Sequence, residues 1–107
     1  MRAPNGSRVQ VGTVAHVDAA NDLALVSIPS PFKGAGIAPV ATCDVGDDAI
    51  AIGYPWGDDE ISGRGAYTTK GGISNRNGDS VYTDASVNPG NSGGGLFTEA
   101  GLVGVIV

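Results

Sequence analysis

Apolar and polar residues alternate over short stretches along most of this chain, a period of two that is typical of strands with one buried face. Over residues 8–17, for example, Val9, Val11, Ala15 and Val17 fall on alternate positions. No stretch longer than about ten residues keeps the 3.6-residue period of a helix. The pattern therefore predicts an all-β domain, with further strands over residues 23–28, 49–53, 61–69, 72–75, 80–83, 94–98 and 102–107.

Turn-forming residues separate these predicted strands. The pair Asn77 and Gly78 lies between two of them and is typical of a tight hairpin. Several short strands joined by Gly, Asn and Asp turns indicate a barrel or a sandwich. The longest break is residues 29–40, which hold three prolines and two glycines. We expect this segment to link two parts of the fold, residues 8–28 and residues 41–107.

The composition suits one small globular β-domain, because 41% of the 107 residues are hydrophobic and 18 are glycine. The net charge is −5 and the six Lys and Arg residues are scattered, so we expect no nucleic-acid partner. No apolar run approaches the roughly 20 residues of a membrane-spanning helix. We expect no membrane span, and the first residues lack the apolar core of a signal peptide.

Cys43 is the only cysteine, so no disulfide forms within the chain. No catalytic motif surrounds the thiol, and we predict a structural role for it rather than a nucleophilic one. The acidic run Asp58, Asp59 and Glu60 lacks the alternating spacing of a calcium loop, so we predict a solvated loop and no metal site. Tyr54 and Trp56 are expected to pack beneath the domain rather than to bind a ligand.

The most specific segment is residues 83–97, TDASVNPGNSGGGLF, with Ser92 at the centre of GNSGG. A serine hydroxyl is a weak nucleophile, so an enzyme that uses one supplies a general base and stabilises the oxyanion formed on attack. Gly90, Gly93 and Gly94 permit backbone angles that other residues avoid, which lets amides point into a small concavity beside the hydroxyl. By itself the segment fits either a nucleophilic serine or a glycine-rich turn with an incidental serine.

Four blocks in the same order resemble the HtrA/Deg branch of the trypsin-like serine proteases. They are the nucleophile segment just described, NDLALVSI at residues 21–28, VGDDAIAIGYPWG at residues 45–57 and GLVGVIV at residues 101–107. The resemblance implies a double Greek-key β-barrel. Residues 8–28 would be the end of the first barrel, residues 29–40 the linker between barrels, and residues 41–107 most of the second barrel.

The resemblance also implies roles for individual residues. Ser92 would be the nucleophile that forms an acyl-enzyme with a polypeptide substrate, and Asp22 the acid that orients a histidine. The amides of Gly90 and Ser92 would form the oxyanion hole. Ser86 would lie at the base of the primary specificity pocket, where a small neutral residue favours a small or medium apolar substrate side chain. The reaction needs no cofactor and no metal.

A second motif also fits GNSGG, namely the GxSxG nucleophile elbow of α/β-hydrolases. That elbow requires a strand before the serine, a helix after it and a later histidine. Here Pro89 and Gly90 precede Ser92 and no histidine follows it. The sequence therefore favours the trypsin-like interpretation.

The general base is not found among these residues. His16, the only histidine, lies six residues before Asp22, at a position that this family does not use as its base, and we predict a solvated strand histidine. We therefore expect an incomplete protease domain, lacking part of the first barrel and the end of the second, with little activity on its own. The alternative is a non-catalytic remnant or interaction module.

An incomplete barrel leaves strand edges unpaired. We expect such a chain to associate through those edges, or with a chain that supplies the missing strands. The resemblance implies a secreted or periplasmic location.

Overall fold

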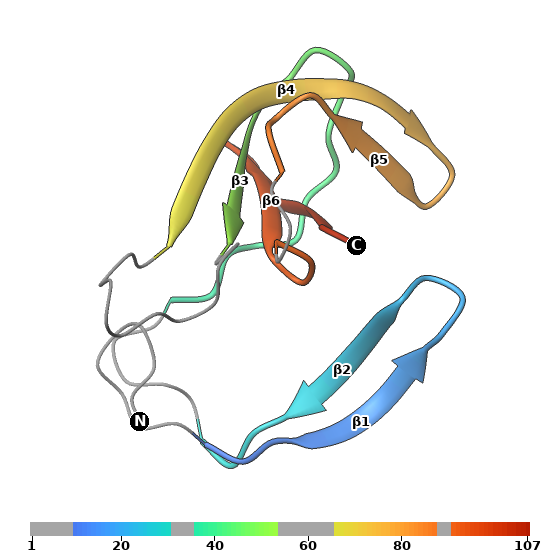
Figure 1. The fold of residues 1–107 in the computed structure, drawn as a ribbon, viewed down its shortest axis with the longest axis vertical. Coiled ribbons are helices and arrows are strands. Elements are labelled where there is room, and N and C mark those ends of the chain that lie inside the picture. The colour runs from blue at the N-terminus through green and yellow to red at the C-terminus, as the bar shows by residue number, and fades with distance from the viewer. Residues whose placement is uncertain (1–9, 31–35, 54–65, 88–90) are drawn as a thin grey trace. The chain divides into compact units, whose positions relative to one another are not determined.

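The computed structural model describes residues 10–30, 36–53, 66–87 and 91–107. The chain divides into two compact units, Met1–Ile37 and Ala38–Val107, and each is described by itself (Figure 1). All of the regular structure in the described residues is β, which confirms the predicted all-β class. Among these residues there is no helix that could cross a bilayer.

The first unit contains an antiparallel hairpin of β1 (Thr13–Asp18) and β2 (Leu23–Ser27). β1 begins later than the predicted strand, which extended over residues 8–17. Gln10 lies before β1 and is bonded to the backbone of Ser30 through its side chain. The side-chain amide donates to the Ser30 carbonyl at 2.8 Å, and the side-chain oxygen accepts from the Ser30 amide at 3.2 Å. The register shifts between Val14 and His16, so a bulge interrupts the alternation from which the strand was predicted.

The second unit is built on a five-stranded sheet in the order β5-β4-β3-β6-β7. All neighbouring strands are antiparallel, and the sheet curls around its concave face, with β4 bending strongly along its length (Figure 1). The strands are β3 (Asp48–Gly53), β4 (Tyr67–Asn77), β5 (Ser80–Thr83), β6 (Gly95–Thr98) and β7 (Gly101–Val105). All five correspond to predicted strands.

The prediction was wrong where it divided β4 into strands over residues 61–69 and 72–75, with a break at Lys70 and Gly71. Both residues pair with β3, Lys70 with Ile50 and Gly71 with Ala49, so the ladder continues through them. Gly71 is explained by close packing instead. A Cβ on Gly71 would lie 2.7 Å from the Cα of Ala85, in the segment that crosses this part of β4.

A two-residue turn joins β4 to β5 and confirms the predicted tight hairpin, displaced by one position. Asn77 pairs with Ser80, so the loop residues are Gly78 and Asp79. Gly78 has a φ of 59° and Asp79 has no positive φ, and a positive φ at the first loop position alone is the requirement of a type II′ turn.

The core of the second unit is small and consists mainly of short side chains. Alternate residues of β3 point inward, as its burial pattern shows. Cys43 is 5% exposed and belongs to this core, which agrees with its predicted structural role. The buried hydrophobic residues are Cys43, Ala49, Ala51, Ile73, Ala85 and Leu96.

Candidate functional site

Ser92 lies in a tight turn, residues Asn91–Gly94, which leads directly into β6. The amide of Gly94 donates to the Asn91 carbonyl at 2.9 Å and closes the turn. Gly93, the third residue of the turn, has a φ of 89°, a conformation that L-residues with a side chain rarely adopt. The conformational reason predicted for Gly93 is therefore confirmed.

The extension of β7 holds this turn in place. The Gly93 amide donates to the Ile106 carbonyl at 2.6 Å, and the Ile106 amide donates to the Gly94 carbonyl at 2.8 Å. The amides of Gly93 and Gly94 are thus both engaged within the unit. Among the described residues, neither the amide nor the hydroxyl of Ser92 has a hydrogen-bond partner, and Ser92 is exposed. Both groups of this exposed residue are thus unengaged by the described part of the chain.

Asn91 is the buried member of the turn, with only 3% of its surface exposed. Its Oδ1 has no hydrogen-bond partner among the described residues. A Cβ on Gly53, at the end of β3, would run into this side chain. Gly94 is also needed for space and not, as predicted, for its backbone angles, because a Cβ there would meet the Ile52 carbonyl oxygen and its φ is not positive.

We expect Asn91→Asp to destabilise the protein at neutral pH, because it places an ionisable group at a buried position where the Asn91 oxygen has no partner among the described residues. Burial raises the pKa of a carboxyl that has no cationic partner. The variant should match the parent at pH below the unfolded value of about 3.9 and lose about 3–4 kcal/mol as pH rises to 7. Urea unfolding at pH 3 and pH 7 measures this, with the exposed Asn75→Asp as control. Equal losses for the two variants at pH 7 would contradict the burial argument.

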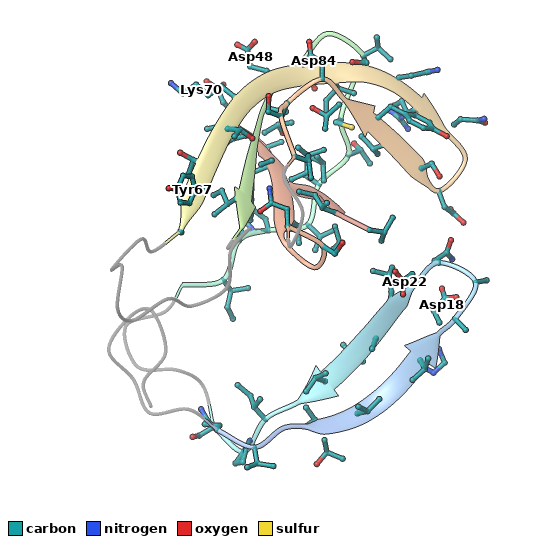
Figure 2. All side chains as sticks on the ribbon, viewed as in Figure 1. Asp18, Asp22, Asp48, Tyr67, Lys70 and Asp84 are labelled. Carbon is teal, nitrogen blue, oxygen red and sulfur yellow. The ribbon has the colours of Figure 1, made fainter. Side chains whose placement is uncertain are left out.

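Asp22 lies in the turn between β1 and β2, at the end of the hairpin (Figure 2). It has a φ of 57°, the only positive φ among the described residues other than glycines. Its amide donates to the Ala19 carbonyl at 3.3 Å. Asp22 is exposed and belongs to the first unit, whereas Ser92 belongs to the second.

Asp18 braces the turn that carries Asp22. Its carboxylate accepts from the Asn21 side-chain amide at 2.9 Å and from the Asn21 backbone amide at 3.3 Å. These hydrogen bonds, above all the one from the side chain, hold the pKa of Asp18 below its ordinary value of 3.8. The charged form of Asp18 is therefore the one that stabilises the turn.

We expect the Asp18 carboxyl to titrate with a midpoint below 3.8 in the folded protein. Since the folded pKa lies below the unfolded one, this stabilisation is complete above the unfolded pKa and is lost as pH falls through the folded pKa. NMR of the Asp18 side-chain carbonyl carbon measures the midpoint, and Asn21→Ala should move it upward. An unchanged midpoint in that variant would exclude Asn21 as the cause.

The remaining predicted site residues lie as follows. Ser86 is exposed, and its carbonyl accepts from the Thr69 hydroxyl at 2.6 Å. His16 is an exposed residue of β1 and pairs with Leu25. No group of three or more metal-ligating side chains occurs in the part of the chain that the structure describes. Gly90, Tyr54, Trp56 and the acidic run at residues 58–60 lie outside the described residues.

Residues 2–105 match the trypsin-like peptidase domain. The chain belongs to this family. It is 39% identical over 101 residues to HhoA of Synechocystis sp., a protein named as a serine protease, covering 86% of this chain and 26% of that protein. It is 38% identical over 99 residues to the periplasmic pH-dependent serine endoprotease DegQ of Escherichia coli, covering 82% of this chain and 21% of DegQ.

The solved structure of Deg5 matches with a TM-score of 0.65 and 31% identity, covering 94% of this chain and 53% of Deg5. The expected HtrA/Deg-like membership and the trypsin-like barrel fold, of which this chain forms a part, are thereby confirmed. The chain spans about a quarter of the length of HhoA and about half of Deg5.

Proposed function

We propose that this chain carries the nucleophile of a serine endopeptidase, with Ser92 forming the acyl-enzyme. The observation that carries the proposal is the Ser92 turn of a trypsin-like peptidase domain. The turn uses the Gly93 and Gly94 amides internally and leaves the Ser92 hydroxyl and amide unengaged among the described residues. A nucleophile needs an accessible hydroxyl, and an oxyanion hole needs an amide with no other partner.

The amides of Ser92 and Gly90 would stabilise the oxyanion of the tetrahedral intermediate. Asp22 would orient the base, a histidine supplied from outside this sequence, because His16 is the only histidine present and lies in the strand that leads to Asp22. The imidazole would take the proton from the Ser92 hydroxyl on attack and return it to the leaving amine. Ser86 would form the base of the pocket for a small or medium apolar side chain.

The substrate would be a polypeptide, and the site of action the periplasm or the cell exterior. DegQ and DegP of Escherichia coli are both named as periplasmic endoproteases. The division into the end of one barrel (residues 8–28), a linker (residues 29–40) and most of a second barrel (residues 41–107) remains part of this proposal. A partial barrel would associate with the strands that complete it, because the edge strand of an incomplete sheet exposes unpaired backbone N–H and C=O groups that can bond to another strand.

Hydrolysis of an unfolded polypeptide such as reduced casein tests the proposal, with the full-length product of the gene that encodes this chain. We expect cleavage that a serine-directed sulfonyl fluoride stops. A chelator and a thiol reagent should have no effect, because the proposed reaction uses no metal and Cys43 is buried. Absence of cleavage, or cleavage stopped only by the chelator or the thiol reagent, would favour the non-catalytic module or a different chemistry.

A further inference from the structure

β4 holds the segment that precedes the Ser92 turn at several points. The Gly72 amide donates to Asp84 Oδ1 at 2.7 Å, and the Gly72 carbonyl accepts from the Thr83 hydroxyl at 2.7 Å. Two residues after Asp84, the Ser86 carbonyl accepts from the hydroxyl of Thr69 at 2.6 Å, three residues before Gly72 on β4. Figure 2 shows Asp84 directly over β4. The segment from Thr83 to Ser86 is therefore fixed to one strand by side-chain and backbone contacts.

β4 and the segment from Thr83 to Ser86 are packed too closely at Gly71 for a side chain to fit between them. A Cβ on Gly71 would reach to 2.7 Å from the Ala85 Cα and would also run against the Ala85 amide nitrogen. Ala85 itself is 5% exposed and belongs to the core. Among the described residues, two contacts constrain Ser86, the next residue: the buried Ala85 before it and the hydrogen bond from Thr69 to its carbonyl. Of these two, only the link to Ala85 would remain if the hydrogen bond were lost.

We propose that Thr69 is a positioning residue that sets the substrate selectivity of the peptidase by fixing the backbone of Ser86. The inference rests on the proposed function, in which Ser86 forms the base of the primary specificity pocket. Thr69 does not touch the substrate. Its hydroxyl holds the pocket base at one depth, so that side chains of one size are preferred. Sequence reasoning could not find it, because a threonine in a strand is ordinary there.

The test uses three substitutions in the full-length protein. Thr69→Val keeps the shape of the side chain and removes the donor. Thr69→Ser keeps the donor. Thr68→Val is the matched control, because Thr68 is the preceding residue of β4, is exposed and pairs with Ile52 of β3.

The measurement is the second-order rate of covalent labelling of Ser92 by peptidyl phosphonates that carry either a valine-like or a phenylalanine-like side chain at the reacting position. Diisopropyl fluorophosphate, which has no such side chain, reports nucleophile reactivity alone. We expect Thr69→Val to lower the ratio of the valine-like to the phenylalanine-like rate by about tenfold, the discrimination that small changes in a pocket provide. The fluorophosphate rate should stay within about twofold, and Thr69→Ser and Thr68→Val should keep the parent ratio.

Three outcomes would overturn the inference and are distinguishable from one another. If the parent reacts with none of the probes, the proposed function fails and the inference fails with it. If the parent reacts but Thr69→Val keeps its ratio, the proposed function stands and Thr69 does not set selectivity. If the fluorophosphate rate falls as far as the peptidyl rates, Thr69 supports the site as a whole, and a specific role at the pocket is excluded.

Discussion

Replacement of Ser92 by alanine is expected to abolish peptidase activity of the full-length protein while leaving its fold intact. The loss in kcat should be about 10⁶-fold, the size seen when a serine nucleophile is removed from a triad, with KM nearly unchanged. The fold should survive because Ser92 is exposed and its hydroxyl has no partner among the described residues. Steady-state hydrolysis of a peptide substrate measures the first effect and the thermal unfolding midpoint measures the second.

Ser74→Ala is the matched control for this substitution, since Ser74 is another exposed serine of the second unit, on β4. It should retain parent activity and the parent midpoint. An Ser92→Ala protein that kept more than about one hundredth of the parent kcat would show that Ser92 is not the nucleophile, because no other group of the turn replaces its chemistry.

Replacement of Asp22 by asparagine is the second large effect that we expect. A triad in which asparagine replaces the acid keeps its geometry but holds the histidine in the wrong tautomer, at a cost of about 10⁴-fold in kcat. The substitution is well matched to this position. Asp22 has a φ of 57°, and asparagine tolerates that left-handed conformation as aspartate does, so the turn should keep its shape.

Steady-state kinetics at pH 7 measure the loss, and Asp79→Asn, at the exposed turn between β4 and β5, is the control for removal of one carboxylate. The control should retain parent kinetics. A loss of less than about tenfold in Asp22→Asn, with the hairpin still folded, would remove Asp22 from the triad and leave its strained turn without a catalytic explanation.

The strands were predictable because alternation and turn residues are local signals. Residues 80–83 form a strand with the predicted bounds, and the hairpin before it moved by only one residue. The predicted break in β4 at Lys70 and Gly71 was wrong, although a glycine normally weakens the interior of a strand. Here Gly71 is required by the close approach of Ala85, a contact between distant parts of the sequence that no local pattern contains.

At the candidate site, too, the sequence predicted the features that depend on local signals and missed those that depend on contacts between distant residues. The motif around Ser92 led to the turn and to the positive φ of Gly93, since glycines beside a serine are a local signal. It did not reveal that Asn91 is buried, because that depends on the close approach of Gly53 at the end of β3. Asn in a glycine-rich segment is typical of exposed turns, so only the tertiary packing separates Asn91 from an ordinary loop residue.

The central claim, that Ser92 is an activated nucleophile, is tested most directly by mass spectrometry of the full-length protein after reaction with a peptidyl phosphonate. The account predicts one phosphonyl group for each chain, located by fragmentation on Ser92, and none in the Ser92→Ala protein. A parent protein that remains unlabelled, or one that carries the label on another residue and keeps it in Ser92→Ala, would contradict the claim.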